Sequence, residues 1–155
     1  MNLKPLVNIL LCGLPILSGG CINEDEPEMR SLVAVGDRLP DFEVVLADGS
    51  TVSTESLAGR QSVVVLFTTT CQDCRDYLPH VEALHRSRPD LPIVCIPREG
   101  DEATINAYWA DNGFTMQYSP EPRRDVYNMF ATAGVPRTYV SDATLTVIAV
   151  DTLEF

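Results

Sequence analysis

The sequence predicts one α/β domain with a mixed central sheet flanked by helices. β-Branched and apolar runs alternate with helical periodicity in the order strand, helix, strand, helix, and two alternating strands follow. A Cys-X-X-Cys pair, Cys71 and Cys74, stands where a strand ends and a helix begins. Of the 155 residues, about 120 remain after a leader and tether, which suits one domain with one core.

The first expected element is an N-terminal hairpin extension. Residues 41–46 are typical of a strand, and an Asp-Gly turn at 48–49 returns the chain through 51–52. Residues 53–57 then predict a short helical turn before the core begins.

The core elements follow in the order of an α/β sheet. Residues 62–67 form a short β-branched and aromatic run, which predicts a buried strand, and helical spacing of apolar residues predicts a helix over 75–87. Cys95 is expected to be a small core residue of the next buried strand. That strand covers residues 91–96, a helix closed by Gly113 follows over 101–112, and a short edge strand is expected at 114–118. A further helix over 125–131 leads to two final strands, at 138–140 and 145–150.

The position of the cysteine pair indicates redox chemistry. Cys71 is expected to face the positive end of the helix dipole, which stabilises a thiolate. Cys74, one turn along, is close enough to form a disulfide with it. A purely structural disulfide is a weaker interpretation, because so short a loop constrains little of the unfolded chain.

Zinc binding is the other common use of a Cys-X-X-Cys pair. A structural zinc site needs four ligands, and therefore a second ligand pair at a workable spacing. His80 and His85 lie on the same expected helix as the cysteines, and Cys95 is isolated in a strand. We therefore expect no metal site.

The N-terminus predicts export and an anchor. Residues 1–20 combine the charge of Lys4 with an apolar stretch that is too short and too interrupted by Gly and Pro to span a membrane, which indicates a signal peptide. Small residues lead directly to Cys21, which resembles the lipobox of bacterial lipoproteins, in which that cysteine is lipidated. Residues 21–34 are acidic and predict a solvated tether, and residues 35–155 are expected to form the domain.

This arrangement places the protein in the cell envelope, lipid-anchored on the periplasmic side or at the outer surface. The formal net charge is −11, and Lys4, the only lysine, lies in the predicted signal peptide. So acidic a surface repels nucleic acid and anionic lipid headgroups, so we expect no nucleic-acid partner.

From about residue 35 to residue 150 the chain resembles the thioredoxin-like superfamily, and within it the membrane-tethered TlpA/ResA type of thiol-disulfide oxidoreductase. The family's opening segment matches Val35-Gly36-Asp37 and Pro40-Asp41-Phe42, and its inserted hairpin and the turn before the first core strand match Asp48-Gly49 and Leu57-Ala58-Gly59-Arg60. The redox pair matches Cys71 and Cys74, and the proline of the active-site helix matches Pro79. The Gly-X-Pro loop matches Gly134-Val135-Pro136. The separation of about sixty residues between the pair and that loop makes the match specific.

The resemblance implies a thioredoxin-like fold and thiol-disulfide exchange without a cofactor. Cys71 would attack as a thiolate, and Cys74 would resolve the mixed disulfide. The Val135–Pro136 bond would be cis, with the Val135 backbone free to pair with a substrate strand. The partners would be protein disulfides, a membrane thiol-electron donor, and the membrane itself through the lipid anchor.

The charges beside the pair bear on the direction of electron flow. Asp73, between the cysteines, opposes thiolate formation, whereas Arg75 and the helix terminus favour it. A less stabilised thiolate means a less oxidising couple, which favours a reductase of other proteins' disulfides over a disulfide donor.

Several departures from the family's pattern set further expectations. Thr70 stands where the family usually has tryptophan, and Tyr77 stands where several members have a buried proton-carrying glutamate. A phenol with a pKa of about 10 carries protons poorly at neutral pH. No stretch after the last strand predicts the terminal helix of most thioredoxin-like domains. Arg137, directly after Pro136, is expected to be solvated or to be a handle for an acidic partner.

Three alternatives remain open from the sequence. A thioredoxin-like copper-binding chaperone would combine the soft thiolates with His80 or His85, although such relatives space their cysteines by three residues. A redox-silent binding module would keep the cysteine pair as a relic. A peroxidase of the peroxiredoxin type would fit Thr68, three residues before Cys71, but not Val64, which replaces its proline.

Overall fold

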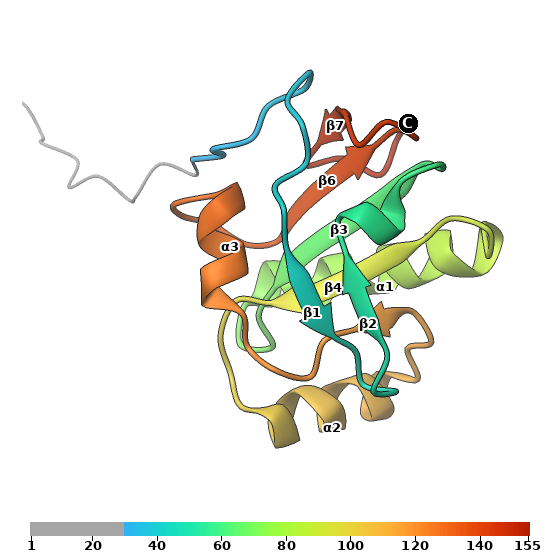
Figure 1. Ribbon diagram of the computed structural model, residues 1–155. Coiled ribbons are helices and arrows are strands. Elements are labelled where there is room, and N and C mark those ends of the chain that lie inside the picture. The colour runs from blue at the N-terminus through green and yellow to red at the C-terminus, as the bar shows by residue number, and fades with distance from the viewer. Residues whose placement is uncertain (1–29) are drawn as a thin grey trace, which may run out of the picture.

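The computed structural model describes residues 30–155 (Figure 1). The predicted signal peptide 1–20 and Cys21 lie outside the described residues, as does the tether up to residue 29. Within the described part, no helix is long and apolar enough to cross a bilayer.

A five-stranded mixed sheet forms the centre of the domain. Its strands are Ser62–Phe67 (β3), Ile93–Pro97 (β4), Gln117–Tyr118 (β5), Arg137–Ser141 (β6) and Val147–Val150 (β7). The spatial order is β5, β4, β3, β6, β7, with β4 parallel to β3 and β5, and β6 antiparallel to β3 and β7. The predicted mixed sheet is confirmed.

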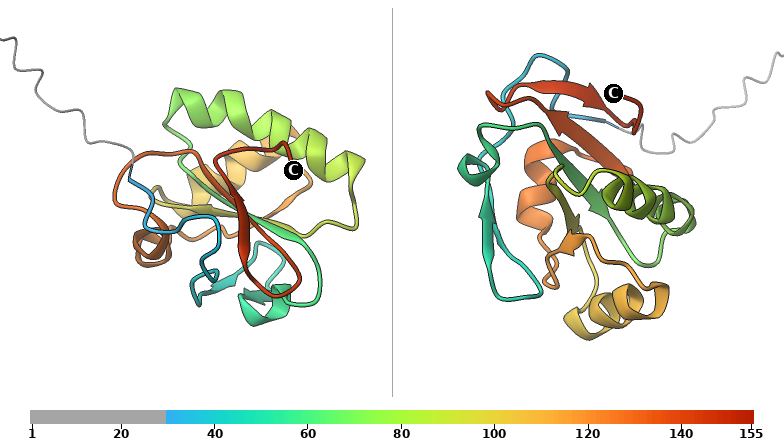
Figure 2. Two further views of the ribbon diagram at one scale, coloured as in Figure 1. Left: turned by 90° about the horizontal axis from the view of Figure 1, so that it is seen from above. Right: turned by 90° about the vertical axis from the view of Figure 1, so that its right-hand side faces the viewer.

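The remaining elements cover the two faces of the sheet. They are the hairpin strands Glu43–Val45 (β1) and Thr51–Ser53 (β2), the 3-10 turn Glu55–Leu57 (η1), and the helices Gln72–Ser87 (α1), Glu102–Asn112 (α2) and Arg124–Phe130 (α3). The hairpin and α3 lie on one side of the sheet and α1 on the other, as the two views of Figure 2 show. The predicted N-terminal hairpin is therefore also confirmed.

Two apolar cores result from the alternation of side chains along β3. Val63, Val65 and Phe67 pack in the core that also contains residues of α1 and α2. Val64 and Leu66 pack in the core under α3 and the hairpin. All six residues of β3 are buried, because a central strand that is covered on both faces has no solvent side.

Helix α1 begins earlier than its apolar periodicity predicts. It includes Gln72 and Cys74 ahead of the expected start at residue 75, and it continues through Pro79. The first turn of a helix makes few apolar contacts, so the spacing of apolar residues does not reveal it. The expected strand over 114–118 is reduced to the two residues of β5.

The folded part begins earlier than the predicted domain boundary at residue 35. Ser31 forms a bridge with Ala131, the Leu32 N–H donates to the Phe130 carbonyl at 2.8 Å, and Val33 is buried. The predicted tether 21–34 is therefore too long at its C-terminal end. Its last residues pack because Val33 supplies an apolar side chain to the core.

The far edge of β7 is covered by the opening segment. Gly36 donates to the Val147 carbonyl and Val147 donates to the Asp37 carbonyl, both at 2.8 Å. No helix follows β7 in the described residues, as the sequence predicts. Instead Leu153 packs against the α1-side core, and the Arg88 guanidinium lies 5.8 Å from the centre of the Phe155 ring.

Candidate active site

The cysteine pair lies at the junction of β3 and α1. Cys71 is the N-cap of α1, with an extended backbone (φ −83°, ψ 127°), and its carbonyl accepts the Arg75 N–H at 3.1 Å. Cys74 therefore stands in the first turn of the helix. The predicted placement of the pair, between a strand end and a helix start, is confirmed.

The two thiols differ in their access to solvent. Cys71 is half-buried, whereas Cys74 has no exposed surface, and both are free thiols. Burial raises the pKa of Cys74 to about 12, although a hydrogen bond from the Thr68 backbone and the charge of Arg98 act in the opposite direction. Only Cys71 is accessible to a large substrate, and the Cys74 thiol is protonated at neutral pH.

The loop before β6 faces the first cysteine. The Cys71 thiol donates to the Val135 carbonyl, with 3.6 Å between Sγ and the oxygen. The Val135–Pro136 peptide bond is cis, as expected. The structure thus brings together the four residues that the sequence proposed for the site, Cys71, Cys74, Val135 and Pro136.

Contacts from α3 and β6 hold this loop. The Tyr127 hydroxyl of α3 donates to the Gly134 carbonyl at 2.9 Å. Arg137, at the start of β6, donates to the Ala133 carbonyl at 3.2 Å and forms an ion pair with Asp151. The loop is thereby tied to α3 and to the end of β7.

Arg137 differs from its prediction. It is 3% exposed, so it is neither a solvated side chain nor a handle for an acidic partner. The β6–β7 pairing brings Asp151 beside it, and the second Asp151 oxygen accepts the Thr138 N–H at 3.1 Å. Arg137 therefore connects the loop before β6 to Asp151 inside the domain.

Tyr77 connects the cysteine helix to β6. Its hydroxyl shares a hydrogen bond with the Thr138 hydroxyl at 2.7 Å. Burial raises the pKa of Tyr77 above its ordinary value, despite the bond to Thr138. Tyr77 is therefore unsuited to proton transfer near neutral pH, and its bond fixes α1 relative to the strand that follows Pro136.

Polar groups in the first turn of α1 are mostly engaged locally. The Arg75 Nε–H donates to the Thr69 carbonyl at 2.9 Å, and the Gln72 amide donates to Asp76 at 2.9 Å. Asp73 is exposed. Arg75 therefore also stabilises the turn that carries Cys71, a role that its position in the sequence did not indicate.

The histidines considered as ligands lie further along α1. His85 stands eleven residues after Cys74, roughly 16 Å along a helix axis, and it lines a hollow with Arg60 and Pro89. Among the described residues no three His, Cys, Asp or Glu side chains are grouped so that they could hold a metal ion. Cys95 is fully buried in β4, as predicted, and burial raises its pKa.

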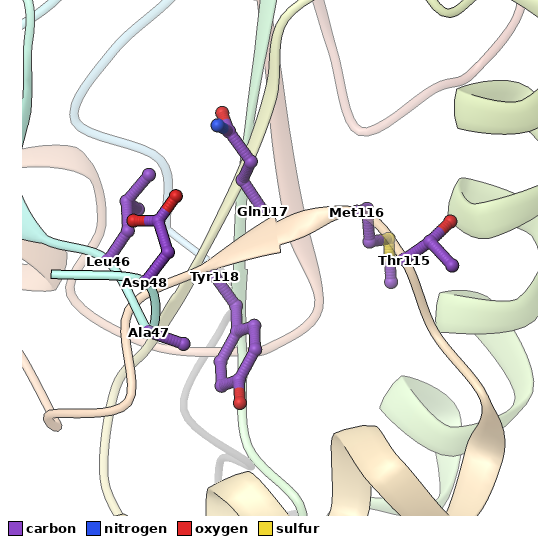
Figure 3. A pocket seen from close by; sticks show the side chains of 7 residues that line it. All are labelled: Leu46, Ala47, Asp48, Thr115, Met116, Gln117 and Tyr118. Carbon is purple, nitrogen blue, oxygen red and sulfur yellow. The ribbon is translucent and has the colours of Figure 1, made fainter. Parts of the chain in front are cut away.

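A separate cavity lies between the hairpin tip and β5 (Figure 3). It measures about 170 Å³ and is lined by Leu46, Ala47, Asp48, Thr115, Met116, Gln117 and Tyr118. The Ala47 N–H donates to the Tyr118 carbonyl at 3.0 Å, which holds the tip in place. No residue of the cysteine site lines this cavity.

Sequence reasoning missed Arg98, Tyr127 and Asp151. They come from the end of β4, from α3 and from the residue after β7. One signal was available for Arg98: it directly follows a strand that is parallel to β3, and the carboxyl ends of parallel strands meet at one edge of the sheet.

A curated protein of similar sequence is a thiol-disulfide oxidoreductase. The thiol-disulfide oxidoreductase ResA of Oceanobacillus iheyensis is 23% identical over 116 residues, which are 71% of this chain and 60% of that protein. The chain therefore spans less than two thirds of the length of this relative.

Solved structures match over most of their length. One is a candidate protein disulfide isomerase from Bacteroides thetaiotaomicron, with a TM-score of 0.73 and 24% identity over 82% of this chain and 84% of that one. Another is the thioredoxin domain of a thiol-disulfide oxidoreductase from Bacteroides vulgatus, with a TM-score of 0.70 and 17% identity over 77% of this chain and 89% of that one. The predicted thioredoxin-like fold is confirmed.

A family model gives the assignment at the level of sequence. The model described as the AhpC/TSA family matches residues 35–150, which include both cysteines and the loop at Pro136. The chain therefore belongs to the AhpC/TSA family and has a thioredoxin-like fold.

Proposed function

We propose that this protein is a thiol-disulfide oxidoreductase that reduces disulfides of extracytoplasmic proteins through Cys71 and Cys74. One observation carries the proposal: a reachable thiol at a helix N-terminus, a buried thiol one turn along, and the Val135 carbonyl 3.6 Å from the first sulfur. A helix N-terminus favours the thiolate of a cysteine placed there. The name of the relative from Oceanobacillus is consistent with this activity.

The reaction has two exchange steps. The Cys71 thiolate attacks one sulfur of a substrate disulfide, a mixed disulfide forms, and the other substrate sulfur leaves as a thiolate that takes up a proton. Cys74 then loses its proton and attacks Cys71 Sγ, which releases the second substrate thiolate. The substrate gains two electrons, and the protein ends with a Cys71–Cys74 disulfide.

The loop at Pro136 would position the substrate. When Cys71 is engaged with a substrate sulfur it no longer donates to the Val135 carbonyl, so that carbonyl is free to accept an N–H from an extended substrate segment. The anchors of the loop through Tyr127 and Arg137 keep this carbonyl in place.

Regeneration and location complete the proposal. A membrane thiol-electron donor would reduce the Cys71–Cys74 disulfide after each turnover. A lipid on Cys21 would hold the protein at the membrane of the cell envelope, on the periplasmic side or at the outer surface, near such a donor. The small residues before Cys21 and the acidic run after it support this location.

Trapping tests the order of attack. A purified Cys74→Ser chain mixed with a disulfide-bonded peptide should accumulate a Cys71–peptide mixed disulfide, because the resolving thiol is absent. The adduct should appear as a mass increase that a reducing agent removes. The matched control is Cys71→Ser. Both variants also carry Cys12→Ala and Cys21→Ala, so this control keeps only the buried thiols of Cys74 and Cys95 and should form no adduct. Equal adducts in both variants would contradict the assignment of Cys71 as the attacking residue.

A further inference from the structure

Arg98 lies at the edge of the sheet that carries the cysteine pair. It directly follows Pro97, the last residue of β4, which is paired with Phe67 at the end of β3. Its N–H donates to the Phe67 carbonyl at 2.8 Å. Because β3 and β4 are parallel, the chain after Phe67 turns towards Cys71 at the same edge where the Arg98 side chain begins.

The Arg98 guanidinium is held in place and mostly buried. Its side chain is 20% exposed, its central carbon lies 5.3 Å from the centre of the Tyr127 ring, and one terminal nitrogen is 2.5 Å from Glu99. Its Nε is buried and has no hydrogen-bond partner among the described residues. A guanidinium is always charged, and a buried donor without a partner is costly, so packing alone does not account for this side chain.

The carboxylate beside Arg98 does not cancel its charge. Glu99 also pairs with Arg124, at 3.1 Å, so one carboxylate serves two guanidinium groups. Glu99 is about half exposed, which weakens its field further. A net positive charge therefore remains beside the cysteine site.

That charge acts on the second cysteine. Burial and the neighbouring Cys71 raise the pKa of Cys74, and the Arg98 charge lowers it. Arg98 is the side-chain cation that lowers the pKa of Cys74, and the Thr68 backbone hydrogen bond lowers it further. Arg75, which is closer in sequence, donates instead to the Thr69 carbonyl.

We propose that Arg98 is a positioning residue for the resolving step: its fixed guanidinium stabilises the negative charge that develops on Cys74 Sγ as this sulfur attacks the mixed disulfide. The proposal rests on the proposed function. In that step the Cys74 S–H bond breaks, the Cys74–Cys71 S–S bond forms, and the bond from Cys71 to the substrate sulfur breaks. The substrate sulfur leaves with the electron pair and takes up the proton.

The expected effect follows from thiol chemistry. Removing the charge should raise the pKa of Cys74, and each unit cuts the thiolate fraction about tenfold, while the greater nucleophilicity of a more basic thiolate restores about threefold. The net expectation is a resolving step about threefold slower per unit. The attack by Cys71 should change little, because the charge acts on the other sulfur.

The test separates the two steps with a small aromatic disulfide that releases one coloured thiolate at each step. Stopped-flow absorbance of the full-length chain should give a first phase from Cys71 and a second from Cys74. Cys71→Ser measures the background from other cysteines. Arg98→Met should slow only the second phase, and Arg98→Lys, which keeps the charge, should restore most of its rate.

Two further variants exclude a merely structural role. Glu99→Gln removes the partner carboxylate and should speed the second phase, since it leaves more net positive charge beside Cys74. Arg60→Met removes one charge from an exposed residue at the opposite end of β3 and should leave both phases within about twofold of wild type.

Clear outcomes overturn the proposal. It is wrong if Arg98→Met leaves the second phase within about twofold of wild type, if both phases slow equally, or if Glu99→Gln slows the second phase as well. Because Glu99→Gln alters an exposed side chain, its effect on the second phase can still be measured even if Arg98→Met does not fold. If the wild type shows no second phase at all, the proposed function itself fails. If the wild type shows a second phase that Arg98→Met does not slow, only the role of Arg98 fails, so the two failures are distinguishable.

Discussion

At the scale of single residues, the proposed reaction assigns attack and resolution to two unlike thiols. Cys71 is reachable at the helix N-terminus, while Cys74 is fully buried one turn along. Burial raises the pKa of Cys74 to about 12, so this residue reacts only after a mixed disulfide brings a sulfur to it. The difference in exposure therefore supports the proposed order of the two exchange steps.

Asp73 leads to a prediction about the redox potential. Its carboxylate is exposed in the first turn of α1, between the two cysteines, where it opposes negative charge on Cys71. We expect the Cys71–Cys74 couple to lie nearer the potential of thioredoxin, about −270 mV, than that of the strong oxidants, about −120 mV. Equilibration with glutathione and separation of the oxidised and reduced forms by mass measures it.

A variant tests the cause. Asp73→Asn should raise the potential by roughly 15 mV, a threefold change in the equilibrium constant, because the opposing charge is lost. Asp111→Asn, an exposed change at the far end of α2, should have no measurable effect. A wild-type potential above about −170 mV would reverse the proposed direction of electron flow.

The residues of the site differ in how far the sequence predicts them. The motif itself identifies Cys71 and Cys74, and the family pattern identifies Val135 and Pro136. Arg137 was misjudged because its partner lies fourteen residues away, and only the pairing of β6 with β7 brings Asp151 to it. An arginine beside a loop has no periodicity that separates a buried ion pair from a solvated side chain.

At the scale of elements, a buried carboxylate fastens α1 to the segment between α2 and β5. Glu82 accepts the backbone N–H groups of Thr115 and Met116 at 2.9 and 3.1 Å, and the Thr115 hydroxyl at 2.6 Å. Arg86 donates to it at 2.6 Å. Burial alone would raise the pKa of Glu82, but these hydrogen bonds lower it to about 2.

This arrangement predicts a pH-dependent contribution to stability. Because the folded pKa is depressed from 4.5 to about 2, the contribution is fully present above about pH 4.5 and is lost as the pH falls through 2. Its upper bound is about 3 kcal/mol. Glu82→Gln should therefore lower the free energy of unfolding by about 2 kcal/mol at pH 7, and by much less near pH 2.

Urea denaturation at the two pH values measures the difference. The matched control is Glu55→Gln, an exposed carboxylate 3.9 Å from Arg38, which should change stability by less than about 0.5 kcal/mol. Equal destabilisation by Glu82→Gln at both pH values would show that shape rather than charge holds the segment.

Element positions were predictable where apolar periodicity is strong and less so elsewhere. The apolar run of β3 and the apolar spacing of α1 can be recognised in the sequence, because each element must face a core. The two residues of β5 carry no such pattern, since their pairing depends on the neighbouring β4. The packing of residues 31–33 was missed because a short apolar stretch after an acidic run resembles a linker.

At the scale of the whole molecule, the early start of the folded part limits how far the active site can stand from an anchor. Ser31 already pairs with Ala131 of the domain. If Cys21 carries a lipid, the ten residues from Cys21 to Arg30 span at most roughly 35 Å even when fully extended. The Cys71 site would then lie close to the membrane surface. It could reach a thiol donor in that membrane, but not substrates far from the membrane.

The anchor itself gives the last prediction. Cys21→Ala should move the protein from the membrane fraction to the soluble or unprocessed pool, because its acidic surface offers no electrostatic attraction to anionic lipids. Cys12→Ala is the matched control, since this cysteine lies in the predicted signal peptide and its loss should leave the distribution unchanged. Fractionation followed by mass analysis of the mature N-terminus measures both variants. A soluble wild-type protein with an unmodified N-terminus would contradict the anchor and, with it, the proposal that the donor lies in the same membrane.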